Sequence, residues 1–134
     1  MVDSEAVVPI HTNADVVAAR QKGRELAGRL GFTPTSATLI ATAISELARN
    51  IVCYARHGEI VIRCVQLGER FGITVVAQDK GPGIANISQA MQDGFSTSGG
   101  LGLGLPGVKR LMDEFDIASG TNMGTTVTIK KWKQ

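Results

Sequence analysis

Residues 94–107 read Gly94-Phe-Ser-Thr-Ser-Gly-Gly-Leu-Gly-Leu-Gly-Leu-Pro-Gly107, and six of these fourteen residues are glycine. Glycine leaves backbone N–H groups uncovered and reaches φ > 0 without steric cost, so such a loop can bend its amides around an anion. A helical pattern follows over residues 105–115, and Pro106 lies in its first turn, where no N–H donor is needed. A helix start adds unpaired N–H groups and partial positive charge. The stretch therefore predicts a phosphate-binding loop.

Two other interpretations of this stretch have to be weighed. Glycine-rich runs also form flexible linkers, but leucine alternates with glycine through residues 101–105, and a solvated linker has no need of regularly spaced leucines. Residues 102–107 also spell G-x-G-x-x-G. A dinucleotide fold is not indicated, because no predicted strand leads directly into the run and no acidic strand end follows about twenty residues later.

The chain of 134 residues has the length and composition of one soluble globular domain, which we expect to span residues 1–134. Hydrophobic residues make up 43% and charged residues 19%, and the net charge is +2. The basic tail Lys130-Lys-Trp-Lys133 is typical of a solvated strand end, because no platform of aromatic and basic residues accompanies it. We therefore expect no nucleic-acid partner.

No signal peptide is evident, and no apolar run approaches the length of a membrane span, so we expect a cytoplasmic protein without membrane association. Cys53 and Cys64 then fit reduced thiols better than a disulfide. Cys53 and His57 share a helix face, with Cys64 beyond, but the spacing is not that of a zinc site. A histidine at a helix end is the favoured interpretation of His57.

The hydrophobic periodicity predicts two long helices in the first half of the chain. One opens at the capping box Thr12-Asn-Ala-Asp15 and stops at Gly31. The other starts near Pro34 and runs to about residue 56. A short helix is expected over 86–92 and a longer one over 105–115. Strands are expected over residues 6–10, 59–67, 71–79, 116–119 and 125–132, the first at a sheet edge because it contains Pro9.

This order of elements predicts the fold class. Two long helices, a further helix and about five strands favour an α/β (α+β) two-layer sandwich. Because consecutive strands are joined mostly by tight turns, we expect a mixed β-sheet covered by helices rather than a doubly wound sheet.

Glu46 and Asn50 form the first candidate site, in the second long helix. A spacing of four puts both on one face, among the apolar residues Ala43, Leu47 and Ile51. Such a pair is often only an exposed polar ridge. Functionally, a carboxylate can take a proton from a hydroxyl or water, while an amide oxygen suits Mg²⁺, a hard cation.

Asp79-Lys-Gly-Pro-Gly83 and Gly124-Thr-Thr126 are the second and third candidates, at strand ends. Either can be a turn and nothing more. Functionally, Asp79 beside bare backbone can accept a hydrogen bond from an exocyclic amine such as that of adenine. A hydroxyl of the third segment can share the polar cluster of that aspartate.

Three motifs occur in this chain in a fixed order: Glu-x-x-x-Asn on a helix, Asp-x-Gly-x-Gly after a strand, and Gly-x-Gly-Leu-Gly-Leu before a helix. In this order they resemble the motifs of the GHKL ATPase/kinase superfamily. Ile44-Ser-Glu-Leu-Ala-Arg-Asn-Ile51 and the segment Asp93–Phe115 go further and are similar to the RsbT-type switch kinases of the bacterial stressosome. The resemblance covers essentially the whole chain. It implies the GHKL (Bergerat) ATP-binding fold.

The resemblance also implies roles for individual residues. Glu46 would be the general base, Asn50 the Mg²⁺ ligand and Asp79 the adenine reader, with ATP and Mg²⁺ as cofactors. The other expected nucleotide-binding positions are Gly81, Gly83, Gly100, Gly102, Leu103, Gly104 and Thr125. One departure from the relatives matters, because residues 86–104 contain no Lys or Arg. Lys109 and Arg49 are the alternatives for the cation that meets the phosphate charge.

The activity implied is that of a cytosolic serine/threonine protein kinase. Its substrates would be STAS-domain scaffold and antagonist proteins (RsbS- and RsbR-like), and after release it would activate an effector such as an RsbU-like PP2C phosphatase. A histidine-kinase catalytic domain is disfavoured, because the chain has only two histidines. The open alternative is a binding module, an anti-sigma factor or phosphatase activator in which nucleotide tunes affinity.

Overall fold

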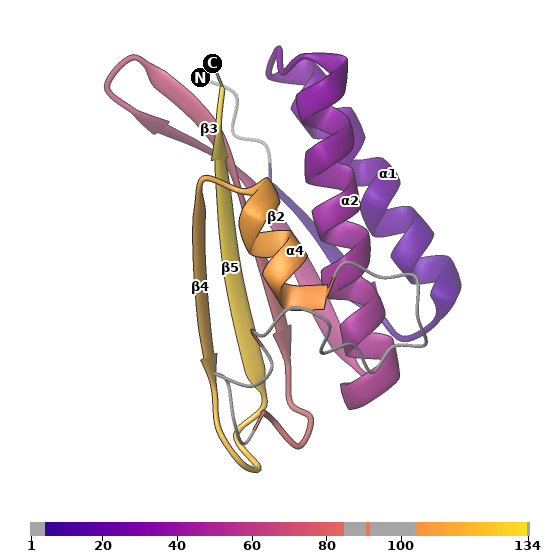
Figure 1. Ribbon diagram of the computed structural model, residues 1–134. Coiled ribbons are helices and arrows are strands. Elements are labelled where there is room, and N and C mark those ends of the chain that lie inside the picture. The colour runs from indigo at the N-terminus through magenta and orange to yellow at the C-terminus, as the bar shows by residue number, and fades with distance from the viewer. Residues whose placement is uncertain (1–4, 85–90, 92–103, 134) are drawn as a thin grey trace.

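Helices and a β-sheet form the two layers, with the helices on one face of the sheet (Figure 1). The computed structural model describes residues 5–84, 91 and 104–133. In chain order the elements are β1 (Glu5–Ile10), α1 (Asn13–Arg29), α2 (Pro34–Asn50), the π-helix η1 (Ile51–Ala55), β2 (Gly58–Leu67), β3 (Arg70–Asp79), α4 (Gly104–Leu111), β4 (Glu114–Ser119) and β5 (Thr125–Trp132). The expected two-layer sandwich is confirmed.

The sheet has the strand order β1-β2-β3-β5-β4, and every pairing in the described chain is antiparallel. The expectation of a mixed sheet is therefore wrong. The connection through α4 leads to β4, which lies at the sheet edge, and the β4–β5 hairpin then inserts β5 beside β3. Strands β3 and β4 run in the same direction but are not neighbours, so no parallel pair forms.

Both long helices begin at side-chain caps. Thr12 Oγ1 accepts a hydrogen bond from the Asp15 N–H at 3.4 Å, and Asp15 Oδ2 accepts one from the Thr12 N–H at 3.0 Å, which confirms the capping box. In α2, Thr33 Oγ1 accepts from the Ser36 N–H at 3.1 Å. These bonds satisfy N–H groups that have no partner within the helix.

The core lies between the sheet and the helices. Alternate residues of the central strands point toward α2, and the buried side chains include Ile40, Ile44, Leu47, Ile60, Ile62, Ile73, Val75 and Ile129. This period of two explains why β2, β3 and β5 were predictable from the sequence. Across the described residues, we find no helix that is both long and apolar enough to cross a membrane.

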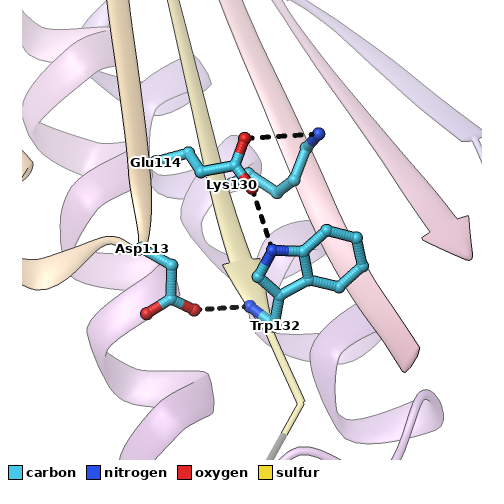
Figure 2. Close-up of polar contacts among 4 residues, drawn as sticks. All are labelled: Asp113, Glu114, Lys130 and Trp132. Carbon is cyan, nitrogen blue, oxygen red and sulfur yellow. Dashed lines mark hydrogen bonds and ion pairs between the residues drawn. The ribbon is translucent and has the colours of Figure 1, made fainter. Parts of the chain in front are cut away.

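The helix expected over 105–115 ends four residues earlier than predicted. It ends at Leu111, and Glu114 and Phe115 belong to β4. Asp113 Oδ2 accepts from the Trp132 N–H at 2.7 Å, and Trp132 Nε1 donates to Glu114 Oε2 at 2.9 Å (Figure 2). Lys130 Nζ lies 3.6 Å from Glu114 Oε1 in the same cluster. These contacts with β5 stabilise a strand from Glu114, where the local sequence favoured a helix.

Candidate active site

Glu46 lies on the face of α2 that packs in the core. Only 3% of the residue is exposed, although glutamate is a charged side chain. Arg49 Nη1 lies 3.9 Å from its Oε1 atom, and the Arg49 side chain is 41% exposed. The interpretation as an exposed polar ridge is therefore wrong for Glu46. Burying a carboxylate costs free energy, and such groups concentrate at functional sites.

Asn50 follows one helical turn after Glu46 and is the last residue of α2. It is half-buried, and its spacing of four residues puts it on the same face. The chain continues as the π-helix η1, which ends at Arg56 with φ 70°, where the Arg56 N–H donates to Ile51 O at 2.8 Å. Single π-turns occur frequently at functional sites. The sequence predicted a helix as far as residue 56 but not this change in winding.

Tyr54 is a further candidate site residue that the sequence analysis did not name. It lies four residues after Asn50 in η1 and is 43% exposed. Burial raises the pKa of its hydroxyl, and the nearby Cys53 and Glu46 raise it further. The Tyr54 hydroxyl thus lies close enough to Glu46 for the charge of the carboxylate to act on it. The signal that identifies it is the repeated four-residue spacing of Glu46, Asn50 and Tyr54.

Asp79 ends β3, opposite Gly58 of β2 and Thr125 of β5. Its Oδ1 atom accepts a hydrogen bond from the Gly81 N–H at 2.9 Å, which fixes the carboxylate at the start of the following loop. A Cβ atom at Gly81 would lie 2.7 Å from the Ala55 Cβ of η1. The loop after Asp79 thus packs directly against the end of the helix that carries Glu46 and Asn50.

Gly83 has φ 81° and packs against the backbone of Gly120. A side chain at Gly83 would overlap the Gly120 carbonyl group. Tight packing within the protein is thus sufficient reason for glycine at positions 81 and 83. Close passage of the backbone to a nucleotide remains the hypothesis derived from the sequence.

Ser119 connects the loop after Asp79 to the last hairpin, and the sequence analysis missed it. Its Oγ atom accepts from the Ile84 N–H at 2.7 Å, donates to Gly124 O at 2.8 Å and lies 2.8 Å from Thr125 Oγ1. The Asn122 N–H donates to Pro82 O at 2.6 Å in the same region. Thr125 therefore lies next to Asp79 in register, and its hydroxyl contacts Ser119. No regular spacing in the sequence marks Ser119, because one of its partners, Ile84, lies 35 residues away.

Gly104 opens α4 with φ 68°, a conformation that favours glycine. Leu105 and Val108 are buried, and α4 packs against α2. The other expected positions of the phosphate loop, Gly100, Gly102 and Leu103, lie outside the described residues, as does most of the helix expected over 86–92. Of the two candidate cations, Lys109 is exposed on α4, and Arg49 lies beside Glu46.

The described geometry brings three of the predicted site residues, Asn50, Asp79 and Thr125, to one end of the sandwich. Asp79 is paired with Gly58 of β2. A Cβ atom at Gly58 would lie 2.8 Å from Cγ2 of Ile51, and Ile51 directly follows Asn50. In the described part of the chain, no three His, Cys, Asp or Glu residues gather as a metal cluster.

Comparison with known proteins identifies relatives of this chain. Residues 11–131 match the model of the histidine kinase-like ATPase domain. The chain is 52% identical over 130 residues to the serine/threonine-protein kinase RsbT of Bacillus subtilis (strain 168), covering 97% of this chain and 98% of that protein. It is 34% identical over 100 residues to the anti-sigma F factor of Geobacillus thermodenitrificans (strain NG80-2), covering 70% and 68%.

A second anti-sigma F factor, from Geobacillus sp. (strain WCH70), is 33% identical over 110 residues, covering 78% of this chain and 75% of that protein. Both matches extend over most of the two proteins, so they reflect the whole domain rather than an isolated motif. The chain therefore belongs to the histidine kinase-like ATPase family, and within it the chain is a protein kinase of the RsbT type.

Proposed function

We propose that the chain is a MgATP-dependent protein kinase that phosphorylates a serine or threonine hydroxyl of a partner protein. Use of ATP follows from membership in the ATPase family. The observation that carries the proposal is the burial of Glu46, 3% exposed, on the same helix face as Asn50. A carboxylate in the core is costly, and a module that only binds nucleotide has no need of a base.

Glu46 is the proposed general base. Its carboxylate accepts the proton of the attacking hydroxyl as that oxygen forms its bond to phosphorus. Phosphoryl transfer depends mainly on positioning and electrostatic stabilisation, and a base that orients the nucleophile contributes to both. Arg49 Nη1 lies 3.9 Å from Glu46 Oε1 and places a positive charge beside the carboxylate.

Asn50 is the proposed Mg²⁺ ligand through its side-chain oxygen. The amide oxygen is a hard, neutral ligand of the kind that suits Mg²⁺. Bound Mg²⁺ supplies neutralisation of the phosphate charge. The start of α4 at Gly104 adds unpaired N–H groups on the same side, and Lys109 or Arg49 is the additional cation.

Asp79 is the proposed reader of adenine. Its Oδ1 atom is held by the Gly81 N–H, so the carboxylate is oriented before any ligand binds. A carboxylate accepts from the exocyclic amine of adenine but faces a carbonyl oxygen in guanine. Gly81, Gly83, Gly100, Gly102, Leu103 and Thr125 complete the proposed nucleotide site.

The proposed substrates are STAS-domain proteins of the RsbS and RsbR types, and the proposed effector is an RsbU-like PP2C phosphatase. This part rests on the resemblance to RsbT-type switch kinases and on the 52% identical relative. We further propose that residues 1–134 act as a single cytoplasmic catalytic domain. Two partners would then compete for overlapping surfaces of one small protein.

The test combines two substitutions in α2 with mapping of phosphorylated sites. Labelled ATP, Mg²⁺ and candidate STAS-domain proteins are incubated with wild-type protein, Glu46→Gln or Asn50→Ala. Glu46→Gln should reduce transfer by about 10²–10⁴-fold while nucleotide binding is retained. Asn50→Ala should weaken MgATP binding itself, because the lost oxygen is a metal ligand.

Glu25→Gln, on the exposed side of α1, is the matched control and should transfer phosphate at the wild-type rate. Wild-type transfer by Glu46→Gln would remove the base assignment.

The second candidate function is a binding module in which nucleotide tunes partner affinity. Its support is the similarity to two anti-sigma F factors over about 70–78% of this chain. In that case Glu46→Gln would leave partner affinity and its nucleotide dependence unchanged, and wild-type protein would transfer no phosphate to any partner that it binds.

A further inference from the structure

The two histidines of the chain, His11 and His57, meet at the β1–β2 edge of the sheet although they are 46 residues apart in sequence. Their Nδ1 atoms lie 2.7 Å apart. The ring centroids are 4.9 Å apart, and the ring planes make an angle of 65°. Both side chains are exposed. None of the roles proposed above for the kinase uses this pair.

Backbone geometry brings the two rings together. Ile10 and Gly58 form the last register pair of β1 and β2, so the residues next to them lie side by side beyond the strand ends. The His11 N–H donates to Asp15 Oδ2 at 2.8 Å, which fixes His11 against the first turn of α1. His57 follows Arg56, whose φ of 70° turns the chain from η1 into β2.

The chemistry of two facing Nδ1 atoms is restricted. An imidazole pair at hydrogen-bond distance needs one ring to donate and the other to accept. When both rings carry their proton on Nε2 instead, two lone pairs point at a common position. Neutral imidazole nitrogen is a common ligand of Zn²⁺ and related ions, and the pair converges as such ligands do.

Metal binding requires only a small change in the distance between the two Nδ1 atoms. Zn–N bonds of about 2.0–2.1 Å in tetrahedral geometry place two nitrogen ligands roughly 3.3 Å apart. The Nδ1 atoms would thus separate by roughly 0.6 Å, which exposed side chains can accommodate by rotation. Asp15 places a carboxylate near the pair, because its Oδ2 atom accepts hydrogen bonds from the His11 and Thr12 N–H groups at 2.8 and 3.0 Å.

We propose that His11 and His57 form a two-histidine binding site for a divalent transition-metal ion of the Zn²⁺ class. Among the described residues no larger cluster of potential ligands exists, so water completes the coordination. Mg²⁺ does not compete for this site, because it requires oxygen ligands. The site is independent of the proposed kinase reaction.

The position of the site gives the metal a structural consequence. His57 directly precedes Gly58, where a Cβ atom would lie 2.8 Å from Ile51 Cγ2 and 3.1 Å from Asp79 Cβ. A metal bound by both histidines therefore ties the first turn of α1 to the segment between the Asn50 helix and β2. We expect it to stabilise this end of the protein against unfolding.

The test measures metal binding in the absence of nucleotide. Because exposed Cys53 and half-buried Cys64 are competing ligands, the experiment uses a Cys53→Ser, Cys64→Ser background. Calorimetric titration with Zn²⁺, and Co²⁺ absorption as a second readout, should show one saturable equivalent at neutral pH. His11→Gln and His57→Gln should each weaken binding by at least about tenfold, since even second-shell partners of a metal contribute about 10–100-fold.

His11→Gln provides the second variant if His57→Gln disturbs the turn, and circular dichroism verifies that both remain folded. Equal metal affinity in the background protein and in either glutamine variant would overturn the proposal, as would the absence of saturable binding. Neither of these outcomes bears on phosphoryl transfer, which is measured separately with Mg²⁺ and ATP.

Discussion

At the scale of a single residue, Asp79 shows how a strand end can hold a carboxylate in one orientation. The β3 strand delivers its carboxylate to the sheet end, and the Gly81 N–H holds one oxygen at 2.9 Å. The sequence was sufficient to predict the position of Asp79 at a strand end, because Asp-x-Gly-x-Gly at the end of an alternating run is a local pattern. Ser119 shows the opposite case, since only the folded chain brings Ile84, 35 residues away, to the same hydroxyl as Gly124 and Thr125.

The first prediction is that the protein prefers ATP to GTP and that Asp79→Asn reduces this preference. A carboxylate facing the guanine carbonyl leaves a buried polar group unpaired, which costs about 1–3 kcal/mol. An asparagine amide can instead donate to that carbonyl. Titration of both nucleotides against both proteins is the measurement. Equal affinity of the wild-type protein for ATP and GTP would remove Asp79 from this role.

Ser119→Ala should loosen the loop that follows Asp79. The substitution removes the acceptor of the Ile84 N–H and the contact with Thr125. Leaving a partly buried donor without its acceptor costs about 1–3 kcal/mol. We expect a lower free energy of unfolding and weaker nucleotide binding. Thr121→Ala, exposed in the neighbouring turn, is the control, and a similar loss in that variant would contradict the role of Ser119.

At the scale of whole elements, helix starts were predictable and helix ends were less so. The Thr12 capping box and Pro34 are local signals, and α1 and α2 begin where they indicate. Residues 112–115 carry a pattern compatible with a helix, yet Asp113 and Glu114 bind Trp132 and β4 begins. The π-turn over Ile51–Ala55 was missed for a similar reason, since it arises where the helix meets the sheet end.

The N-terminal cap of α1 predicts a specific dependence of stability on pH. Backbone hydrogen bonds from His11 and Thr12 lower the pKa of Asp15 below the ordinary value of 3.8. A lowered pKa in the folded state contributes stability that is complete above 3.8 and is lost as pH falls through the folded-state pKa. Asp15→Asn should therefore be less stable than wild type near neutral pH, and the difference should shrink in acid.

Urea unfolding from about pH 7 to pH 3 measures this difference. Asp116→Asn, which removes an exposed carboxylate from β4, controls for the change in net charge. A difference between wild type and Asp15→Asn that stays constant over this range would show that the carboxylate charge does not stabilise the cap.

At the scale of the whole molecule, the proposed site and the Trp132 cluster lie at opposite ends of one sheet. Several residues proposed for nucleotide binding lie where β3 ends and β5 begins, whereas Trp132, whose polar contacts are drawn in Figure 2, pairs with Gly72 near the other end of β3. Arg70 lies over the Trp132 ring at 4.4 Å, and Trp132 is only 7% exposed. The two-layer arrangement followed from the count and order of elements. The antiparallel order of the strands could not be predicted in this way, because sequence order alone cannot place β5 between β3 and β4.

This separation makes Trp132, the only tryptophan in the chain, a reporter of global unfolding. Trp132 pairs with Gly72, seven residues along β3 from Asp79, which corresponds to roughly 23 Å at the rise of a strand. A ligand that binds only the folded state stabilises it by about 2.7 kcal/mol at a hundred times its Kd. MgATP should therefore raise the unfolding midpoint reported by Trp132 fluorescence while leaving the native emission spectrum unchanged. In Asn50→Ala the shift of the midpoint should largely disappear at the same nucleotide concentration. A change in native emission on binding would instead show that the two ends of the sheet are coupled.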